Sequence, residues 1–314
     1  MTDLLVEPFR APYLQRALVE AVLLGVLAGL VGVHVVLRRL AFLADTFTHT
    51  VFPGLAVAFA LGSSLFVGAL VAGVASAVAF TALDRSRRVT SDAALAVVLT
   101  SFFAAGVIVV SRTERYTADL TGLLFGRILT VDARQIAETA VVLALVALVL
   151  VALHKELLLR AFDPDGARAL GYPIGRLDLV LNVLVVLVVV AAARAVGTVL
   201  TVAFLVTPAA TARLVGRSVG SMYVVAGAVG AAAGWLGLAV SYRVSITQGW
   251  RVASGASVVL AMTALFLVVL AGRGLVRAAV AANGRRAAEA GAWTSGGGGC
   301  SGRPSRCWRW WGGG

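Results

Sequence analysis

Residues 179–212 read LVLNVLVVLVVVAAARAVGTVLTVAFLVTPAATA, an apolar run in which Arg194 is the single charged residue. About 20 apolar residues, at a rise of ~1.5 Å each, cross a hydrocarbon core of roughly 30 Å. The run is too long for one crossing, and Arg194 and Gly197 interrupt it near its middle. The pattern therefore predicts two membrane helices, 179–193 and 195–212, separated by a break.

The composition of the whole chain agrees with a membrane protein. Of its 314 residues 60% are hydrophobic and 13% are charged, and the mean hydropathy is +0.95. A soluble domain carries about 25% charged residues, so a water-soluble fold is nearly excluded. The formal net charge of +12 does not indicate a nucleic-acid partner, because the arginines lie between apolar runs and in the tail, where they set topology and contact lipid headgroups.

Apolar stretches bounded by charged residues predict an all-α fold, a polytopic integral membrane helix bundle with about eight to nine transmembrane helices. The uncharged stretch 46–83 is divided at the small polar turn 61–64. The predicted spans are 21–37, 46–62, 65–83, 93–111, 135–153, 179–193, 195–212, 219–241 and 252–272. Eight spans with one re-entrant segment is the alternative. The transmembrane domain is predicted to cover 1–284, followed by a disordered tail rich in Gly, Arg and Trp over 285–314.

Basic residues are concentrated in alternate loops, which predicts the orientation in the cell membrane. The side that carries more of them includes Arg38, Arg39, Arg213 and Arg217 and the loop 155–176. The positive-inside rule makes this side cytoplasmic and puts the N-terminus outside. No cleavable signal peptide is evident before the first apolar run, so that run is expected to stay as a membrane helix. The acidic residues of the opposite loops, Glu114, Asp119 and Asp132, are expected to be solvated.

An aspartate and a histidine, Asp45 and His49, stand four residues apart at the start of an apolar helix. At this spacing they project from one helix face. A carboxylate and an imidazole suit Mn(II), Zn(II) or Fe(II), and a two-fold homodimer would double the ligand set. The alternative is structural: Asp45 caps the helix and His49 is hydrogen-bonded at an interface.

The loop between the spans at 135–153 and 179–193 contains FDPDGARALGYP at 162–173. Asp163 is a candidate N-cap, Pro164 a first-turn proline and Gly171 a stop signal, so the segment predicts a short capped helix. Such a helix is either a surface connection or a rigid contact for a cytosolic partner.

Isolated polar residues inside or beside the spans are expected to be structural. His34 is expected to pack with its ring hydrogen-bonded, Glu138 to lie near the outer interface, and Asn182 and Arg194 carry only lone signals.

Motifs for ATP hydrolysis and for intramembrane catalysis are absent. No G-x-x-x-x-G-K-[ST] occurs, and the only lysine, Lys155, lies outside any phosphate-binding context. H-E-x-x-H and G-x-S-x-G are also missing. The chain is therefore not expected to be an enzyme, and any ATP hydrolysis belongs to a separate subunit.

Three motifs together resemble the manganese/zinc/iron ABC transporter permease family. They are LRRLAFLAD at 37–45 with His49 and Pro53-Gly54, the segment Asp163–Gly171, and VTPAATARL at 206–214. Ala44 stands where that family usually has glycine. The resemblance covers most of residues 13–272, and the order of its motifs makes it specific.

The resemblance implies a permease subunit that moves a divalent transition metal, manganese or zinc and possibly iron, with no permanently bound cofactor. It implies Asp45 and His49 as metal ligands in the pore of a homodimer. It implies coupling to ATPase subunits through Asp163, Arg168, Ala169, Leu170 and Gly171. The further partners it implies are cytosolic ATP-binding subunits, an extracytoplasmic metal-binding protein and membrane lipid.

Other transport classes stay open from the residues alone. A secondary metal/proton carrier also places acidic and histidine residues in its helices. An ATP-driven siderophore or cobalamin permease would instead need a wide pore without protein ligands. A purely structural membrane scaffold explains the spans but not the ordered motifs.

Overall fold

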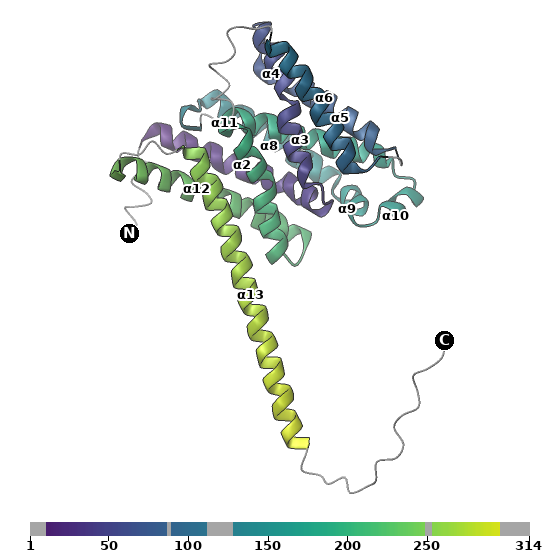
Figure 1. Ribbon diagram of the computed structural model, residues 1–314, viewed down its shortest axis with the longest axis vertical. Helices are drawn as coiled ribbons and strands as arrows, with labels where there is room; N and C mark the ends of the chain where they lie inside the picture. The colour runs from purple at the N-terminus through teal and green to yellow at the C-terminus, as the bar shows by residue number, and fades with distance from the viewer. Residues whose placement is uncertain (1–10, 87–88, 112–127, 249–252, 296–314) are drawn as a thin grey trace. The chain divides into compact units, whose positions relative to one another are not determined.

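The computed structural model describes residues 11–86, 89–111, 128–248 and 253–295 (Figure 1). Two compact units, Met1–Val269 and Leu270–Gly314, divide the chain. The first unit holds the helix bundle, and the described part of the second is the end of the last helix, α13. The outer-loop residues Glu114 and Asp119 and the tail 296–314 lie outside the described residues.

Every regular element among the described residues is helical, as predicted. The elements are α2 (Pro12–Leu37), α3 (Ala41–Thr50), α4 (Phe52–Ala60), α5 (Leu65–Asp84), α6 (Ser91–Ser111), the 3-10 turn η2 (Ile128–Thr130), α8 (Ala133–Ala152), α9 (His154–Phe162), α10 (Pro164–Ala169), α11 (Ile174–Val215), α12 (Val219–Gln248) and α13 (Ser254–Ser295).

The described helices include 8 that are long and apolar enough to cross a membrane. One of these spans, Ala41–Ala60, combines α3 and α4, and a shorter apolar helix, Leu200–Val215, comes in addition. The predicted architecture of about eight to nine membrane helices is therefore confirmed. The division of the chain at 284/285 stays a prediction.

The first span begins earlier than predicted. The charge of Glu20 predicts that the span begins at residue 21, whereas α2 begins at Pro12. Glu20 is fully buried and accepts a hydrogen bond from Thr139 Oγ1 at 2.8 Å. A buried partner on α8 thus allows a carboxyl group inside the helix.

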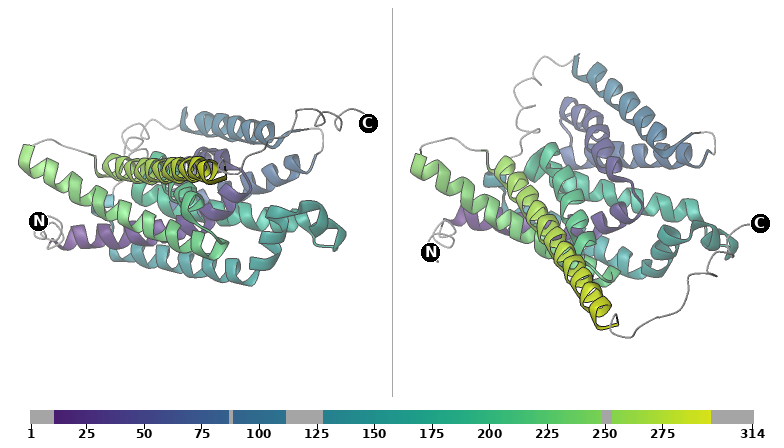
Figure 2. Two further views of the ribbon diagram at one scale, coloured as in Figure 1. Left: turned by 90° about the horizontal axis from the view of Figure 1, so that it is seen from below. Right: turned by 60° about the horizontal axis from the view of Figure 1, so that its bottom comes forward.

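Glycines on both helices let the backbones of α2 and α12 approach each other closely (Figure 2). A Cβ on Gly230 would stand 2.8 Å from backbone atoms of Gly25, and one on Gly29 would stand 2.9 Å from the Gly227 nitrogen. Membrane helices associate mainly by such close packing, because lipid offers no hydrophobic drive between them. The most buried spans are α2 and the first part of α11, which form the centre of the bundle, and α12 packs on both.

The long helix α11 is broken at the predicted place. Gly197 has φ 80° and ψ 169°, outside the helical region, so the segments before and after it are two helices. Glycine tolerates this positive φ, which costs any other residue strain.

Three further helices, α4, α5 and α6, pack on one another, and α3 leads from α2 into this group (Figure 1). α3 itself packs on α11 and α6. It therefore connects the two groups of helices, and it carries Asp45 and His49.

Candidate metal-binding site and polar network

The candidate ligands Asp45 and His49 lie on the open face of α3. Leu43, Ala44 and Phe47 are buried with no exposed surface, because this face of α3 packs into the core. In contrast, the side chains of Asp45 and His49 are 48% and 41% exposed. The i, i+4 spacing thus brings the two side chains together on one face, as predicted.

Asp45 and His49 lie close enough to bind one ion together, but they are only two ligands. Asp45 Oδ1 lies 3.7 Å from His49 Nε2, beyond hydrogen-bond distance but close enough for both atoms to approach one ion. The His49 ring stands edge-on to Phe103 of α6, with centroids 6.1 Å apart. Among the described residues no group of three or more His, Cys, Asp or Glu side chains is placed to hold a metal.

The alternative that Asp45 caps the helix does not fit the structure. The N-cap of α3 is Leu40, and Asp45 lies in the interior of the helix.

A proline interrupts the helix immediately after His49. Pro53 carries no backbone N–H, so the usual bond from residue 53 to the His49 carbonyl is absent. One membrane span is thereby divided into α3 and α4. Interrupted membrane helices expose backbone groups and commonly line transport sites.

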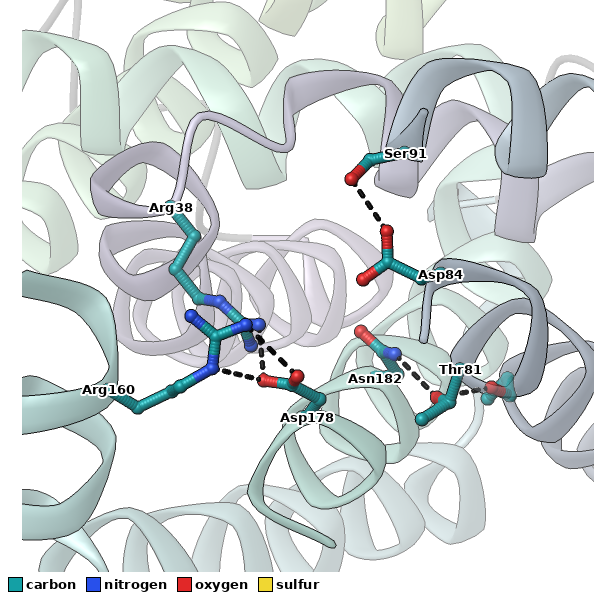
Figure 3. A network of polar contacts seen from close by, with 8 residues as sticks. Arg38, Thr81, Asp84, Ser91, Arg160, Asp178 and Asn182 are labelled. Atoms are coloured by element: carbon teal, nitrogen blue, oxygen red, sulfur yellow. Dashed lines mark hydrogen bonds and ion pairs between the residues drawn. The ribbon is translucent and has the colours of Figure 1, made fainter. Parts of the chain in front are cut away.

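Asp178 joins three elements at the end of the bundle predicted to be cytoplasmic (Figure 3). Its carboxylate lies at the start of α11. It accepts a hydrogen bond from Arg38 at the end of α2, and two from Arg160 of α9, at 3.0 Å from Nε and 3.1 Å from Nη2. We call these three residues the Asp178 cluster.

The Asp178 cluster is largely shielded from solvent. The exposed fractions of its side chains are 6% for Arg38, 9% for Asp178 and 20% for Arg160. Burial lowers the pKa of the Arg38 guanidinium, and the adjacent Asp178 carboxylate opposes this shift. The cluster therefore brings two guanidinium groups onto one carboxyl group.

The 163–171 segment forms the predicted capped helix, α10. The Asp163 side chain accepts a hydrogen bond from the Gly166 N–H at 2.8 Å, and Pro164 occupies the first turn. Gly171 ends the helix with φ 80°, and the Tyr172 N–H returns to the Ala167 carbonyl. This arrangement is the helix-ending motif that glycine favours.

α10 presents its predicted contact residues to solvent. Ala167 is buried against the bundle, whereas Arg168, Ala169, Leu170 and Gly171 are exposed, and Arg168 pairs with Asp165 on the surface at 2.7 Å.

Comparison with known proteins decides the family. The model of the "ABC 3 transport family" matches residues 10–273. The chain belongs to this family. It is the membrane permease subunit of a metal ABC importer, a multi-pass protein of the cell membrane and not itself an enzyme.

Several relatives of this permease are named after the metal that they transport. It is 39% identical over 256 residues to "Manganese import system permease protein ScaB" of Streptococcus gordonii, covering 82% of this chain and 90% of the relative. It is 34% identical over 268 residues to "Chelated iron transport system membrane protein YfeD" of Yersinia pestis, covering 85% and 88%.

Two solved structures share the fold of the permease. PsaBC from Streptococcus pneumoniae in complex with Fab matches with a TM-score of 0.74 and 36% identity, over 86% of this chain and 95% of that one. An inward-facing putative metal-chelate type ABC transporter matches with a TM-score of 0.65 at 20% identity, which supports the fold alone.

The isolated polar residues of the permease are hydrogen-bonded within the bundle. His34 Nε2 lies 2.7 Å from the Tyr223 hydroxyl, and Asn182 Nδ2 donates to Thr81 Oγ1 at 2.9 Å (Figure 3). Arg194 donates to Glu138 at 2.7 Å, joining α11 to α8. None of these contacts brings a further ligand to Asp45 and His49.

Sequence reasoning missed two buried carboxyl groups, Asp178 and Glu20. Each of them directly precedes an apolar run, and a charge at the end of such a run usually marks the membrane surface. The sequence therefore predicts both residues at the ends of membrane spans, and not as buried groups. A weak signal existed for Asp178: it directly precedes the apolar run 179–212, in a region rich in arginine.

Proposed function

We propose that this permease imports manganese, with Asp45 and His49 of two copies forming one transport site on a two-fold axis. The main observation is that both side chains lie on the open face of α3, while the described part of one chain brings no third His, Cys, Asp or Glu ligand to them. A second copy supplies two carboxylates and two imidazoles without further residues. This mixed oxygen and nitrogen set suits Mn(II).

The relatives support manganese as the cargo. ScaB and the MntC protein of Listeria monocytogenes are both named for manganese, and the latter is 36% identical over 257 residues. Zinc and iron are the competing cargoes, since imidazole also suits both ions and YfeD is named for chelated iron. The metal is cargo, so the site must bind it weakly enough for release.

The energy source is ATP bound by separate cytosolic subunits that contact α10. Phe162 and Leu170 expose 67% and 70% of their surfaces beside the capped helix, and such apolar exposure on a rigid element suits a protein partner. An extracytoplasmic metal-binding protein delivers the ion on the opposite side. Movement of α10 during ATP binding opens the pore alternately to each side, while lipid surrounds the remaining faces.

Replacement of the candidate ligands tests the transport site. Disturbing groups that merely orient a ligand costs about 10–100-fold in metal affinity, so Asp45→Ala and His49→Ala are expected to lower manganese uptake by about 100-fold. The measurement is initial uptake of radioactive manganese by cells that lack their own importer, normalised to the amount of permease in the membrane.

A matched carboxylate controls for the loss of charge. Asp92→Asn, in the first turn of α6, is expected to transport at the wild-type rate. Full manganese uptake by both ligand variants would overturn the proposed site. Uptake of zinc or iron in preference to manganese by the wild type would overturn only the cargo.

A further inference from the structure

The Asp178 cluster connects the 163–171 segment to the helix that carries the candidate ligands. Arg160 lies in α9, whose last residue, Phe162, is followed directly by the cap of α10. Arg38 lies at the end of α2, directly before the turn into α3. Asp178 bonds to both arginines from the start of α11, which packs against α3 (Figure 3).

The connections on both sides of the Asp178 cluster, between α9 and α10 and between α2 and α3, are held by backbone hydrogen bonds. The Asp163 N–H bonds to the Leu159 carbonyl at 2.8 Å, so α9 and α10 meet without a free linker. On the other side the Leu40 N–H returns to the Val35 carbonyl at 3.0 Å, and Arg39 takes a positive φ of 58°. This short hydrogen-bonded reversal ties the end of α2 to the first turn of α3.

Stability alone is a poor explanation for the cluster. One nearly buried guanidinium group, that of Arg38, and the partly exposed one of Arg160 both bond to the Asp178 carboxylate, and the Arg38 Nη1 atom has no hydrogen-bond partner among the described residues. Desolvation of such ions offsets most of their attraction, and apolar side chains of similar size often stabilise a fold at least as well. Buried ionic groups are better attested as devices that hold elements in one register.

We infer that Asp178 is a positioning residue that transmits movement of α10 to α3 through Arg160 and Arg38. The inference rests on the proposed contact between α10 and the ATPase subunits. When α10 moves with α9, the bidentate Arg160–Asp178 contact moves the start of α11. Arg38 carries that displacement into the α2–α3 turn, which lies about one helical turn of α3 before Asp45.

The test compares transport with ATP hydrolysis in the complete complex of permease and ATPase subunits, reconstituted in liposomes. For Asp178→Asn we expect about tenfold fewer manganese ions taken up per ATP hydrolysed, a loss in the ordinary range of coupling between distant sites. The rate of ATP hydrolysis is expected to stay close to wild type. Asp178→Glu, which keeps the carboxylate, is expected to restore most of the ratio.

Two further variants separate positioning from folding. Arg160→Lys keeps the charge but loses the bidentate contact, so it is expected to lower the same ratio even if Asp178→Asn does not assemble. Arg176→Gln, an exposed arginine on the same first turn of α11, is the control and is expected to leave the ratio unchanged.

A second readout does not depend on the cargo. Trapping the ATPase subunits with ATP and vanadate is expected to change the hydrogen-exchange rate of residues 41–50 in the wild type but not in Arg160→Lys or Asp178→Asn. If the variants keep this response, or keep the wild-type transport ratio, the inference is overturned. If the wild type shows the response but carries no manganese, only the proposed cargo fails.

Discussion

At the scale of single residues, exposure separates the proposed metal ligand Asp45 from the structural carboxyl group of Glu20. Asp45 is half exposed beside a histidine, whereas Glu20 is fully buried with Thr139 as its hydrogen-bond donor. Both lie within membrane helices, where an ionisable residue is functional by default. The hydrogen bond and the burial of Glu20 instead assign it to the contact between α2 and α8.

Replacement of Glu20 distinguishes a buried hydrogen bond from a required charge. Glu20→Gln keeps an acceptor for Thr139 and removes the cost of burying a carboxylate, so the stability is expected to change by less than about 1 kcal/mol or to rise. Glu20→Ala leaves Thr139 without its partner and is expected to cost about 1–3 kcal/mol. The unfolding temperature of the purified permease in detergent measures both. Equal losses for the two variants would show that the charge itself is needed.

At the scale of helices, contacts between glycines decide which elements can approach one another. Gly25 and Gly29 of α2 face Gly230 and Gly227 of α12 so closely that any side chain on Gly230 would overlap the backbone of α2. Small residues are common in membrane helices, so their mere presence does not predict a particular pair. The partner is determined by which small faces coincide in three dimensions.

Two glycines of the same helix provide a matched test of this packing. Gly230→Ala is expected to destabilise the permease by about 1–3 kcal/mol, because its methyl group overpacks the α2–α12 contact. Gly220→Ala meets no atom within 4 Å and is expected to be neutral or to stabilise α12 by up to about 1 kcal/mol, since alanine favours the helix. Thermal unfolding in detergent compares the pair. The packing account is wrong if both changes have the same effect.

At the scale of the whole molecule, the open face of α3 is where the proposed second copy would pack. Phe42, Asp45 and His49 recur at helical spacing, and Phe42 is 70% exposed. A large exposed aromatic beside two half-exposed polar groups is poorly suited to lipid, but it suits an interface around a polar pathway.

Cross-linking tests this arrangement in native membranes. In a background with Cys300 and Cys307 changed to Ser, Phe42→Cys is expected to give covalent dimers with a short bis-maleimide reagent, because the two α3 faces meet on the axis of the proposed dimer. Leu148→Cys, on an exposed face of α8 (69%), is the control and is expected to remain monomeric. Gel electrophoresis measures both. Dimers from Leu148→Cys alone would place the interface on α8 and remove Asp45 from the axis.

Much of the fold and of the candidate site could be predicted from local sequence. The break at Gly197, the cap at Asp163 and the stop at Gly171 are confirmed, because turn and capping chemistry depends on neighbouring residues. The shared face of Asp45 and His49 follows from helical periodicity for the same reason. The predicted start of α2 was wrong, because the burial of Glu20 depends on Thr139, more than a hundred positions away.

The order of residues along the chain thus specified the helical class, the approximate number of membrane spans, the cap at Asp163, the stop at Gly171 and the identity of the candidate ligands. Only the folded chain established that Arg38 and Arg160 converge on Asp178, that α2 and α12 meet through glycines, and that the α3 ligand pair is left open. The physical reason is range: periodicity and capping act within a few residues, whereas a buried ion cluster or a helix crossing exists only when distant segments pack together.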